Sequence, residues 1–290
     1  MTARVVDGVA IAKDIRARWR TRAEALARSS VTPWLAVVLV GENPASRVYV
    51  RNKMKACAEN GVHCELHEFA VDASEEAVLA RILALAADPN VHGILVQLPL
   101  PSHFHNGKVL DAIPVEKDVD GFHLYNLGGL VVGEAVFPPC TPYGVMSMLD
   151  YLQIPIEGQN AVVIGRSNIV GKPLALMLLA RSATVSICTS RTRNLSQYTL
   201  LADILVVATG RPHLVTGPMV KEGAAVIDVG INRLANGKLV GDVEFDSVRE
   251  RAGWITPVPG GVGPMTITMV LANTILAAER YAQKHARVPA

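Results

Sequence analysis

Two successive series of short apolar runs, separated by helix-forming segments, constrain the fold of this chain most strongly. In the first half, "WLAVVLV" (34–40), "VHCELHEF" (62–69) and "VHGILVQLPLP" (91–101) alternate with amphipathic segments of helical period. A second series begins at "NAVVIG" (160–165). Strands that alternate with helices favour a mostly parallel sheet covered by helices. We therefore predict an α/β protein with two α/β domains, of which the second contains a Rossmann-type parallel sheet.

The segment between the two series sets the predicted domain boundary. Residues 98–140 are rich in Pro, Gly and His and interrupt the periodic pattern. The last apolar segment has the length and spacing of a long helix, and we expect it to return to the first domain. The predicted division is residues 1–139 plus 264–290 for the first domain and 140–263 for the second, with a cleft between them.

Composition excludes several classes of protein. The 290 residues are 50% hydrophobic and 19% charged, which is typical of a folded chain rather than a disordered one. The formal net charge is +2, from 28 basic and 26 acidic residues, so we expect no nucleic-acid partner and no binding to membranes. Four scattered cysteines fit a reducing cytoplasm. "HCELH" (63–67) lacks a second ligand pair, so we predict no metal site.

The loop that opens the second series is a candidate for phosphate binding. In "VIGRSNIVGKP" a predicted strand ends at Gly165, and a predicted helix begins near Gly171. Glycines let the backbone approach a phosphate, and the start of the helix supplies N–H groups and a favourable dipole. The motif G-x-G-x-x-G is absent, so the pattern alone also fits an ordinary tight turn.

The end of the next predicted strand bears on the identity of the nucleotide. Folds that prefer NAD place an acidic residue there, which binds the ribose hydroxyls. This chain instead has "CTSRTR", with Ser190, Arg191 and Arg193, and Arg166 lies in the preceding loop. Cations and a hydroxyl suit the 2′-phosphate of NADP. The alternative is that these arginines are ordinary solvated surface residues.

A second group of candidate residues lies in the first half of the chain. On a helix that starts near Ser46, this serine, Tyr49 and Lys53 share one face because steps of three and four residues stack. Gln97 ends a predicted strand and Asp120 lies in a following loop, positions where ligands collect in open α/β sheets. The alternative is an amphipathic helix whose Lys53 points into solvent.

Six segments, occurring in one order along the chain, resemble the FolD family of bifunctional methylenetetrahydrofolate dehydrogenases and methenyltetrahydrofolate cyclohydrolases. Six segments in order are far more specific than any one of them, and they run over most of the chain. The segments are "YVRNKMKACAENG", "VQLPLP", "KDVDGFH", "PCTPYG", "VIGRSNIVGKP" and "PVPGGVGPMT".

The resemblance implies a role for each candidate in the first domain, which would bind tetrahydrofolate derivatives. Lys53 matches the catalytic lysine of the family, and Gln97 matches the glutamine that orients it. Tyr49 matches the tyrosine that stacks near the pterin and aminobenzoate part of the folate. Asp120 matches the aspartate that holds the amino-pyrimidine edge, and Ser46 lies beside the folate in the family pattern.

The resemblance also implies NADP as cofactor of the second domain. The matching cofactor-binding positions are Gly165, Arg166, Ser167, Ser190, Arg191 and Ile231. Pro259, Gly260 and Gly261 match a substrate-binding loop that closes over the cleft. Many family members have a histidine where this chain has Thr189, but the serine and the basic residue after it remain.

The function that the resemblance implies is oxidation of 5,10-methylenetetrahydrofolate with NADP and hydrolysis of the product to 10-formyltetrahydrofolate. It also implies a homodimer formed through the Rossmann domain, and a place in the one-carbon metabolism that supplies purine biosynthesis. Burial of Lys53 would disfavour its charged form and allow proton transfer near neutral pH. Two alternatives stay open: an NADP dehydrogenase of another small substrate, similar to shikimate dehydrogenase, and a catalytically silent folate- or NADP-binding protein.

Overall fold

A computed structural model describes residues 2–286, and the chain divides into two compact units. We call one of them the Rossmann unit; it comprises Met1–Lys13 and Thr141–Thr266. We call the other the Lys53 unit; it comprises Asp14–Cys140 and Ile267–Ala290. Both units combine a parallel sheet with helices, as the alternating pattern of the sequence predicts.

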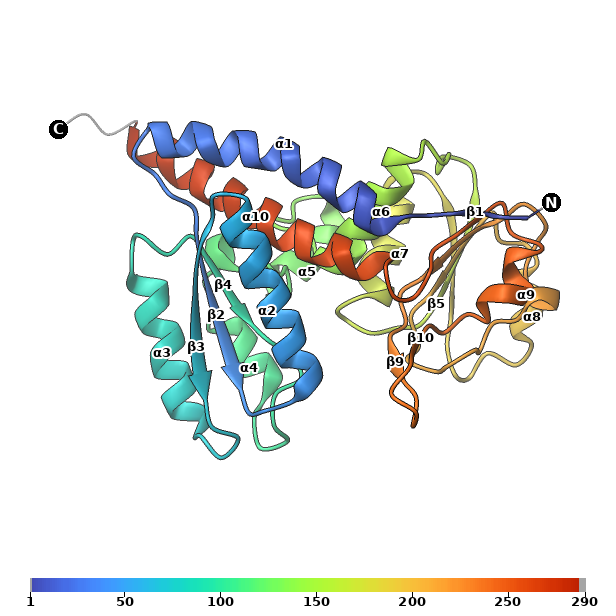
Figure 1. Cartoon of the computed structure of the whole chain (residues 1–290), viewed down its shortest axis with the longest axis horizontal. Coiled ribbons are helices and arrows are strands. Elements are labelled where there is room, and N and C mark those ends of the chain that lie inside the picture. The colour runs from blue at the N-terminus through green and yellow to red at the C-terminus, as the bar shows by residue number, and fades with distance from the viewer. Residues whose placement is uncertain (1, 287–290) are drawn as a thin grey trace. The chain divides into compact units, whose positions relative to one another are not determined.

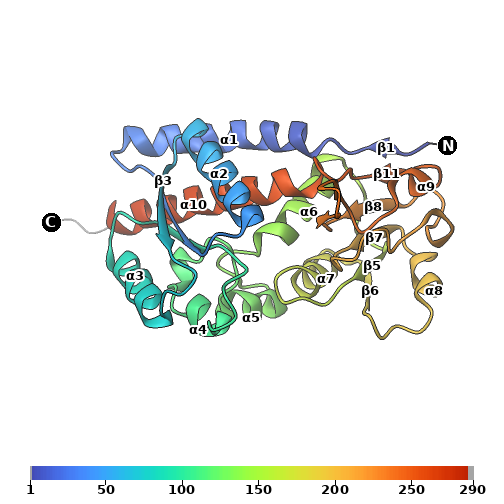
Figure 2. The ribbon, with the colours of Figure 1, turned by 60° about the horizontal axis from the view of Figure 1, so that its bottom comes forward.

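The Lys53 unit is built on a three-stranded parallel sheet in the order β3-β2-β4. Its strands are β2 (Trp34–Val40), β3 (His63–Phe69) and β4 (Gly93–Val96). Helices α2 and α3 cover opposite faces of this sheet (Figures 1 and 2). Six of the seven residues of β2 are buried, because a parallel strand covered on both faces is apolar throughout.

The helices of this unit follow the sheet closely in sequence. They are α2 (Pro44–Glu59), α3 (Glu75–Ala87), α4 (Asn106–Asp111), the 3₁₀ turn η1 (Val115–Lys117) and α5 (Leu124–Val132), together with most of α1 (Gly8–Arg28) and α10 (Val262–Ala286). Asn43 caps α2, since its side chain accepts hydrogen bonds from Ala45 N and Ser46 N. Ser46 therefore lies inside the first turn rather than at the start of the helix.

Helix α10 packs within the Lys53 unit, which confirms the predicted return of the C-terminal helix. Asn273 Nδ2 donates to Val119 O at 2.9 Å, and Arg22 Nε donates to Glu279 Oε1 at 2.8 Å. Within the described residues, α10 is also the one helix long and apolar enough to cross a membrane. Its most apolar window is 67% buried, as expected of a core helix in a folded domain.

The Rossmann unit contains a six-stranded sheet in the order β1-β11-β8-β7-β5-β6, with every pairing parallel. Its strands are β1 (Arg4–Val5), β5 (Asn160–Ile164), β6 (Thr184–Cys188), β7 (Ile204–Val207), β8 (Ala225–Asp228) and β11 (Trp254–Ile255). The chain runs from β5 to β6 on one side and then to β7 on the other. The order of the strands therefore reverses next to β5, and ligands collect in the crevice at such a point.

Four helices, a 3₁₀ turn and a hairpin complete this unit. They are α6 (Cys140–Tyr151), α7 (Gly171–Ala180), α8 (Leu195–Thr199), η2 (Gly217–Met219), α9 (Phe245–Arg249) and the antiparallel pair β9 (Asn232–Arg233) and β10 (Leu239–Val240). The hairpin lies between β8 and β11 in sequence.

The division of the chain differs from the expected one at the N-terminus. We predicted residues 1–139 in the first domain, but Met1–Lys13 belong to the Rossmann unit. The reason is β1, which extends the six-stranded sheet by pairing Arg4 with Trp254. Val6 N also donates to Ile255 O at 2.8 Å. A strand of two residues is too short to produce a period in the sequence.

A buried histidine in the Lys53 unit gives a prediction about stability. His92 precedes β4 and is 6% exposed, and neither ring nitrogen has a hydrogen-bond partner among residues 2–286. Its ring packs edge-on against Tyr281, with 5.2 Å between centroids. Burial, and secondarily the charge of Lys117, lowers the pKa of His92 to about 4. An imidazole that stays neutral in the folded state binds a proton more readily after unfolding.

We therefore expect His92 to destabilise the fold as the pH falls. The stability that neutral His92 contributes is fully present above pH 6.5, the ordinary pKa of histidine. This stability is lost as the pH falls from 6.5 to about 4. The loss amounts to about 3 kcal/mol. Urea unfolding of the wild type and of His92→Phe, followed from pH 7.5 to 4.5, measures it. The free energy of unfolding should fall more steeply with acid in the wild type, and parallel curves would contradict the assignment.

Candidate active site

Lys53 and Gln97 are in direct contact inside the Lys53 unit. Lys53 projects from α2 and is 6% exposed, so the alternative of a solvated lysine is wrong. Its Nζ donates to Gln97 Oε1 at 3.0 Å. Gln97 directly follows β4, and its Nε2 donates to Leu98 O at 2.8 Å. This second bond fixes the amide so that its oxygen faces the lysine.

Asp120 lies close enough to Lys53 for the two charges to interact. Asp120 as a whole is partly exposed, but protein surrounds its carboxyl group. This burial raises the pKa of Asp120 to about 6. The ammonium group of Lys53 opposes the rise, and the carboxylate of Asp118 adds to it. The site therefore holds a buried ammonium next to a carboxyl group that loses its proton near pH 6.

Asp118 shapes the loop that carries Asp120, and the sequence analysis did not select it. Asp118 is 2% exposed, and its carboxylate accepts hydrogen bonds from Gly121 N at 3.2 Å, Phe122 N at 3.2 Å and His123 N at 2.8 Å. An aspartate that binds backbone N–H groups a few residues ahead is a common loop-forming device. The sequence "DVDG" carried this signal.

The two other predicted residues of α2 lie one and two turns before Lys53. Ser46 is buried and Tyr49 is half-buried. Burial raises the pKa of the Tyr49 hydroxyl, so this group stays protonated at neutral pH. The predicted shared face therefore presents the hydroxyl of Ser46, then the hydroxyl of Tyr49 and then the amino group of Lys53 along the helix.

Two thiols adjoin the lysine on its other side. Cys57 is buried and hydrogen-bonded to Cys64, and this bond raises the pKa of the Cys57 thiol well above its usual value. The same bond lowers the pKa of Cys64, which the charge of Lys53 also lowers. In the sequence these two cysteines count only among four scattered ones. Their spacing gave no sign that the helix and the strand would bring them together.

In the Rossmann unit, the predicted glycine loop follows β5 as expected. Gly165 has a φ of +129°, and a Cβ at this position would lie 2.2 Å from Ala208 O. A Cβ at Gly171 would lie 2.2 Å from Gly165 O. Both positions therefore require glycine, because neighbouring backbone lies where a side chain would begin, and we call this loop (165–171) the glycine cradle. This cradle fits a phosphate group, which needs close approach of the backbone.

Ser167 closes this loop onto the start of α7. Its Oγ accepts hydrogen bonds from Val170 N at 3.1 Å and from Gly171 N at 3.4 Å. The hydroxyl thus serves first as a cap for the helix. Lys172 adds a cation at the same place, where its Nζ donates to Asn168 Oδ1 at 2.8 Å.

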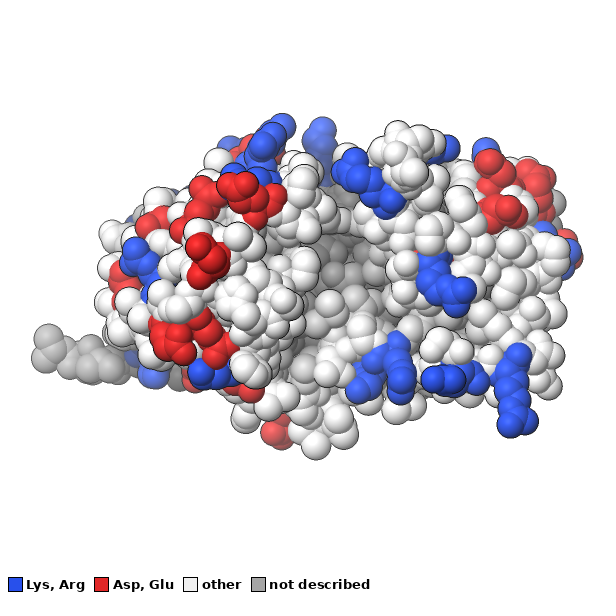
Figure 3. Space-filling view, turned by 90° about the horizontal axis from the view of Figure 1, so that it is seen from below, with Lys and Arg blue, Asp and Glu red and all other residues white. Residues whose placement is uncertain are grey.

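The basic residues predicted for the 2′-phosphate are exposed. Arg166 follows the end of β5, and Ser190 and Arg191 follow the end of the adjacent strand β6. Neither arginine forms a salt bridge within the described part of the chain, and the segment 189–194 contains no acidic residue. Basic side chains gather without adjoining acidic ones along one edge of this unit (Figure 3). The unit therefore offers uncompensated positive charge at the carboxyl ends of β5 and β6.

Ile231 and the predicted loop 259–261 lie in the same unit. Ile231 follows β8 and is 44% exposed. Its Cδ1 lies 3.9 Å from the point where a Cβ of Gly263 would stand. Gly260 has a φ of +101°, and a Cβ at Gly8 would lie 1.9 Å from Gly261 O. The start of α1 therefore packs directly against this loop.

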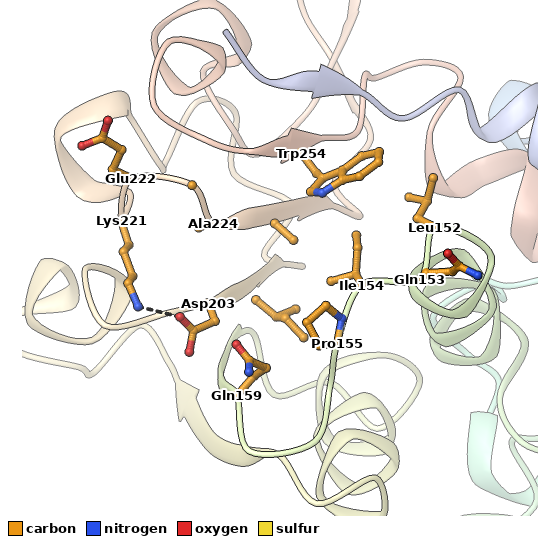
Figure 4. A pocket seen from close by; sticks show the side chains of 13 residues that line it. Leu152, Gln153, Ile154, Pro155, Gln159, Asp203, Lys221, Glu222, Ala224 and Trp254 are labelled. Carbon is orange, nitrogen blue, oxygen red and sulfur yellow. Dashed lines mark hydrogen bonds and ion pairs between the residues drawn. The ribbon is translucent and has the colours of Figure 1, made fainter. Parts of the chain in front are cut away.

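One cavity of about 230 Å³ lies away from all these residues (Figure 4). It opens at the amino ends of β7, β8 and β11, where Asp203, Ala225 and Trp254 line it. Lys221 Nζ donates to Asp203 Oδ1 there at 2.5 Å. Parallel α/β sheets bind ligands at the opposite, carboxyl edge. This cavity is therefore a poor candidate for the active site despite its volume.

Comparison with known proteins supports the same assignment as the geometry. The model of the tetrahydrofolate dehydrogenase/cyclohydrolase catalytic domain matches residues 6–120. The model of the NAD(P)-binding domain of the same proteins matches residues 139–282. The chain is similar to the bifunctional protein FolD of Nitrosospira multiformis, with 62% identity over 288 residues, which cover 99% of each chain.

Solved structures agree in fold and in sequence. The bifunctional enzyme FolD of Campylobacter jejuni is 48% identical, with a TM-score of 0.94 and coverage of 96% of this chain and 99% of that one. The Trypanosoma brucei FolD, solved with NADP and an inhibitor, is 38% identical with a TM-score of 0.94, covering 99% and 100%. Shikimate 5-dehydrogenase of Thermus thermophilus is 16% identical with a TM-score of 0.52, a likeness of fold alone.

These matches extend over nearly the whole chain and include both units. They confirm the resemblance found in the six segments and give no support to the shikimate dehydrogenase alternative. The chain belongs to the tetrahydrofolate dehydrogenase/cyclohydrolase family, the FolD family.

Proposed function

We propose that this protein oxidises 5,10-methylenetetrahydrofolate with NADP and hydrolyses the methenyl product to 10-formyltetrahydrofolate. The observation that carries the proposal is the buried bond from Lys53 to Gln97, next to Asp120, in a chain of this family. Lys53 is 6% exposed and is bonded to a neutral amide, so it is not an ordinary solvated lysine of the surface. It is suited to proton transfer at a bound substrate.

In the oxidation step, NADP⁺ when bound accepts the hydride of the methylene carbon. The folate nitrogens stabilise the resulting cation, so the step needs no strong general base. The contribution of this chain is to hold the reacting groups in contact. Asp120 would bind the amino-pyrimidine edge of the pterin through its carboxylate, and Tyr49 would stack near the pterin and aminobenzoate part beside Ser46. Pro259, Gly260 and Gly261 would supply a loop over the substrate.

In the hydrolysis step, water attacks the methenyl carbon and the ring opens, which requires proton transfers. Lys53 would carry them, since its Nζ is a proton-exchanging group held in one place within the buried site. Gln97 would keep the amine in one orientation, because its own amide is fixed by Leu98 O.

The Rossmann unit would hold NADP at the carboxyl ends of its strands. The glycine cradle would receive a phosphate, with Gly165, Arg166 and Ser167 around it, and the exposed Ile231 would lie near the nicotinamide. Ser190 and Arg191 would bind the 2′-phosphate. Support for NADP over NAD comes from the missing acid after β6 and the uncompensated arginines.

We expect Arg191→Ala to weaken this preference. The KM for NADP⁺ should rise roughly tenfold, because a charge-assisted hydrogen bond to the 2′-phosphate is lost, while the KM for NAD⁺ should hardly change. Arg249→Ala, which removes an exposed arginine from α9, is the matched control. Steady-state kinetics with both cofactors measures the ratio. Equal efficiency of the wild type with NAD⁺ and NADP⁺ would contradict the assigned preference.

We also propose a homodimer formed through the Rossmann unit. Strand β6 ends its sheet, so one of its edges has no partner strand within that sheet. Ile187 on β6 is 45% exposed, and Leu179 and Leu201 on adjoining segments are 59% and 62% exposed. Apolar side chains beside an open edge suit antiparallel pairing with a second copy about a two-fold axis.

Light scattering of purified protein tests the dimer. We expect twice the chain mass for the wild type and for Leu83→Asp, which alters an exposed leucine of α3. Ile187→Asp should shift the mass to that of one chain, because a buried carboxylate at the interface would be unpaired. A wild-type monomer, or a dimer unaffected by Ile187→Asp, would contradict this interface.

All four cysteines are free thiols, which suits the cytoplasmic location that we also propose.

The proposed oxidation is tested by mixing purified protein with methylenetetrahydrofolate and NADP⁺ and recording NADPH absorbance. We expect NADPH to form at a rate proportional to the enzyme concentration. Folded protein that forms no NADPH would contradict the proposal and favour the silent-binder alternative.

A further inference from the structure

Two buried carboxylates at the carboxyl edge of the six-stranded sheet have no part in the function described so far. Asp228 is the last residue of β8, and Asp242 comes two residues after the end of β10. They are 3% and 0% exposed. Burying two carboxylates is costly unless each accepts several hydrogen bonds. The groups that donate these hydrogen bonds therefore show which parts of the chain the two residues hold in place.

Asp242 ties together two loops that leave neighbouring strands. Its Oδ2 accepts hydrogen bonds from Thr209 N at 2.6 Å, Thr209 Oγ1 at 2.9 Å and Gly210 N at 2.9 Å. Its Oδ1 accepts one from Asn232 Nδ2 at 2.8 Å. Thr209 and Gly210 belong to the loop after β7, and Asn232, the first residue of β9, directly follows Ile231 at the end of the loop after β8. One side chain thus fixes the spacing of both loops.

Asp228 in turn fixes Asp242. Asp228 Oδ1 accepts hydrogen bonds from Asp242 N at 3.0 Å and Gly230 N at 2.9 Å, and its Oδ2 accepts one from Val243 N at 2.9 Å. There is no spare room around the pair. A Cβ at Gly230 would lie 2.2 Å from Asp242 Oδ1, and a Cβ at Gly241 would lie 1.8 Å from Asp228 Oδ2.

The loop that Asp242 holds also borders the glycine cradle. Thr209 follows Ala208, whose carbonyl oxygen lies 2.2 Å from where a Cβ of Gly165 would stand. The loops after β5 and β7 therefore touch at the point where the order of the strands reverses, the usual place for a dinucleotide. Contacts thus run without a break from Gly165 through Ala208 and Thr209 to Asp242, and from there to Asn232 beside Ile231.

We propose that Asp242 is a positioning residue for NADP, which holds the loops at Thr209–Gly210 and Ile231–Asn232 in the spacing that the cofactor requires. The inference rests on the proposed function, because it assumes that this edge binds NADP. Asp242 itself would not touch the cofactor or the reacting atoms. It acts through the backbone of Thr209 and Gly210 and through the side chain of Asn232.

The test is the affinity for NADPH, measured by fluorescence titration without folate, for the wild type, Asp242→Asn and Asp203→Asn. In Asp242→Asn an N–H donor replaces one acceptor oxygen and meets other donors, so we expect the dissociation constant to rise at least ~10-fold. Asp203→Asn is the matched control, since Asp203 is also hydrogen-bonded but lies at the amino edge of the same sheet. Its dissociation constant should stay within about twofold of the wild type.

Cyclohydrolase activity with supplied methenyltetrahydrofolate separates positioning from a general structural role. Lys53 and Gln97, the residues assigned to proton transfer, lie in the Lys53 unit, so Asp242→Asn should leave this activity within about twofold of the wild type. Gly230→Ala, which would displace the same carboxylate, should reproduce the selective effect. Unchanged NADPH affinity in both variants, or parallel loss of NADPH binding and cyclohydrolase activity, would overturn the inference. A wild type that binds no NADPH would instead overturn the proposed function.

Discussion

Lys53→Met is expected to abolish the cyclohydrolase activity while a substantial part of the dehydrogenase activity remains. Methionine matches the length of lysine and suits a site that is 6% exposed, so the variant should fold. It cannot carry a proton, and loss of a general acid–base group lowers the rate on the order of 1,000-fold. Hydride transfer needs no such group, so oxidation should fall roughly tenfold at most, through altered packing at the substrate.

The matched control is Lys55→Met on the same helix. The side chain of Lys55 is 74% exposed and faces Glu59 at 3.8 Å, so its loss should leave both activities within about twofold. Rates of methenyltetrahydrofolate hydrolysis and of NADPH formation, measured separately for each variant, provide the comparison. Equal loss of both activities in Lys53→Met, with folate binding intact, would contradict the role given to Lys53.

Asp120→Ala is expected to impair both steps through weaker folate binding. Removal of a carboxylate that binds the pterin should raise the KM for the folate substrate by about 10- to 100-fold. Because the pKa of Asp120 is raised to about 6, protonation should weaken binding in the wild type as the pH falls below 6. The same rise of KM in acid should be absent from the variant, which has no carboxyl group at this position.

Glu116→Ala is the control for this second prediction, since Glu116 is an exposed acid in η1 of the same unit. Its folate KM should match the wild type across the pH range. The measurement is the KM for methylenetetrahydrofolate between pH 5 and 8 for the three proteins. An Asp120→Ala variant with unchanged folate affinity would remove Asp120 from the binding site.

The sequence predicted the long elements well because their patterns extend over many residues. The apolar run 34–40 is β2 with the same bounds, and the long helix expected at the end of the chain is α10 (Val262–Ala286). The strands β1 and β11 have two residues each and left no period to read. Their pairing moves the first thirteen residues into the Rossmann unit, a consequence of contacts between distant parts of the chain.

The candidate site likewise contains residues that the sequence could identify and residues that it could not. The sequence predicts Lys53 on a helix face and Gln97 at a strand end, and the structure joins them by a bond across 44 positions. Asp118 could have been found locally, since its backbone partners lie three to five residues ahead. Asp242 could not, because most of its partners lie about 32 positions earlier in sequence. A carboxylate that accepts hydrogen bonds from backbone groups far away in the sequence leaves no sequence motif.

The most direct test of the whole account follows both products in one reaction. Purified protein is mixed with methylenetetrahydrofolate and NADP⁺, and NADPH and methenyltetrahydrofolate are recorded together. The account predicts that NADPH accumulates with little methenyltetrahydrofolate, because the same chain hydrolyses this intermediate, and that the intermediate builds up in Lys53→Met. An equal rise of NADPH and methenyltetrahydrofolate in the wild type would contradict a bifunctional enzyme.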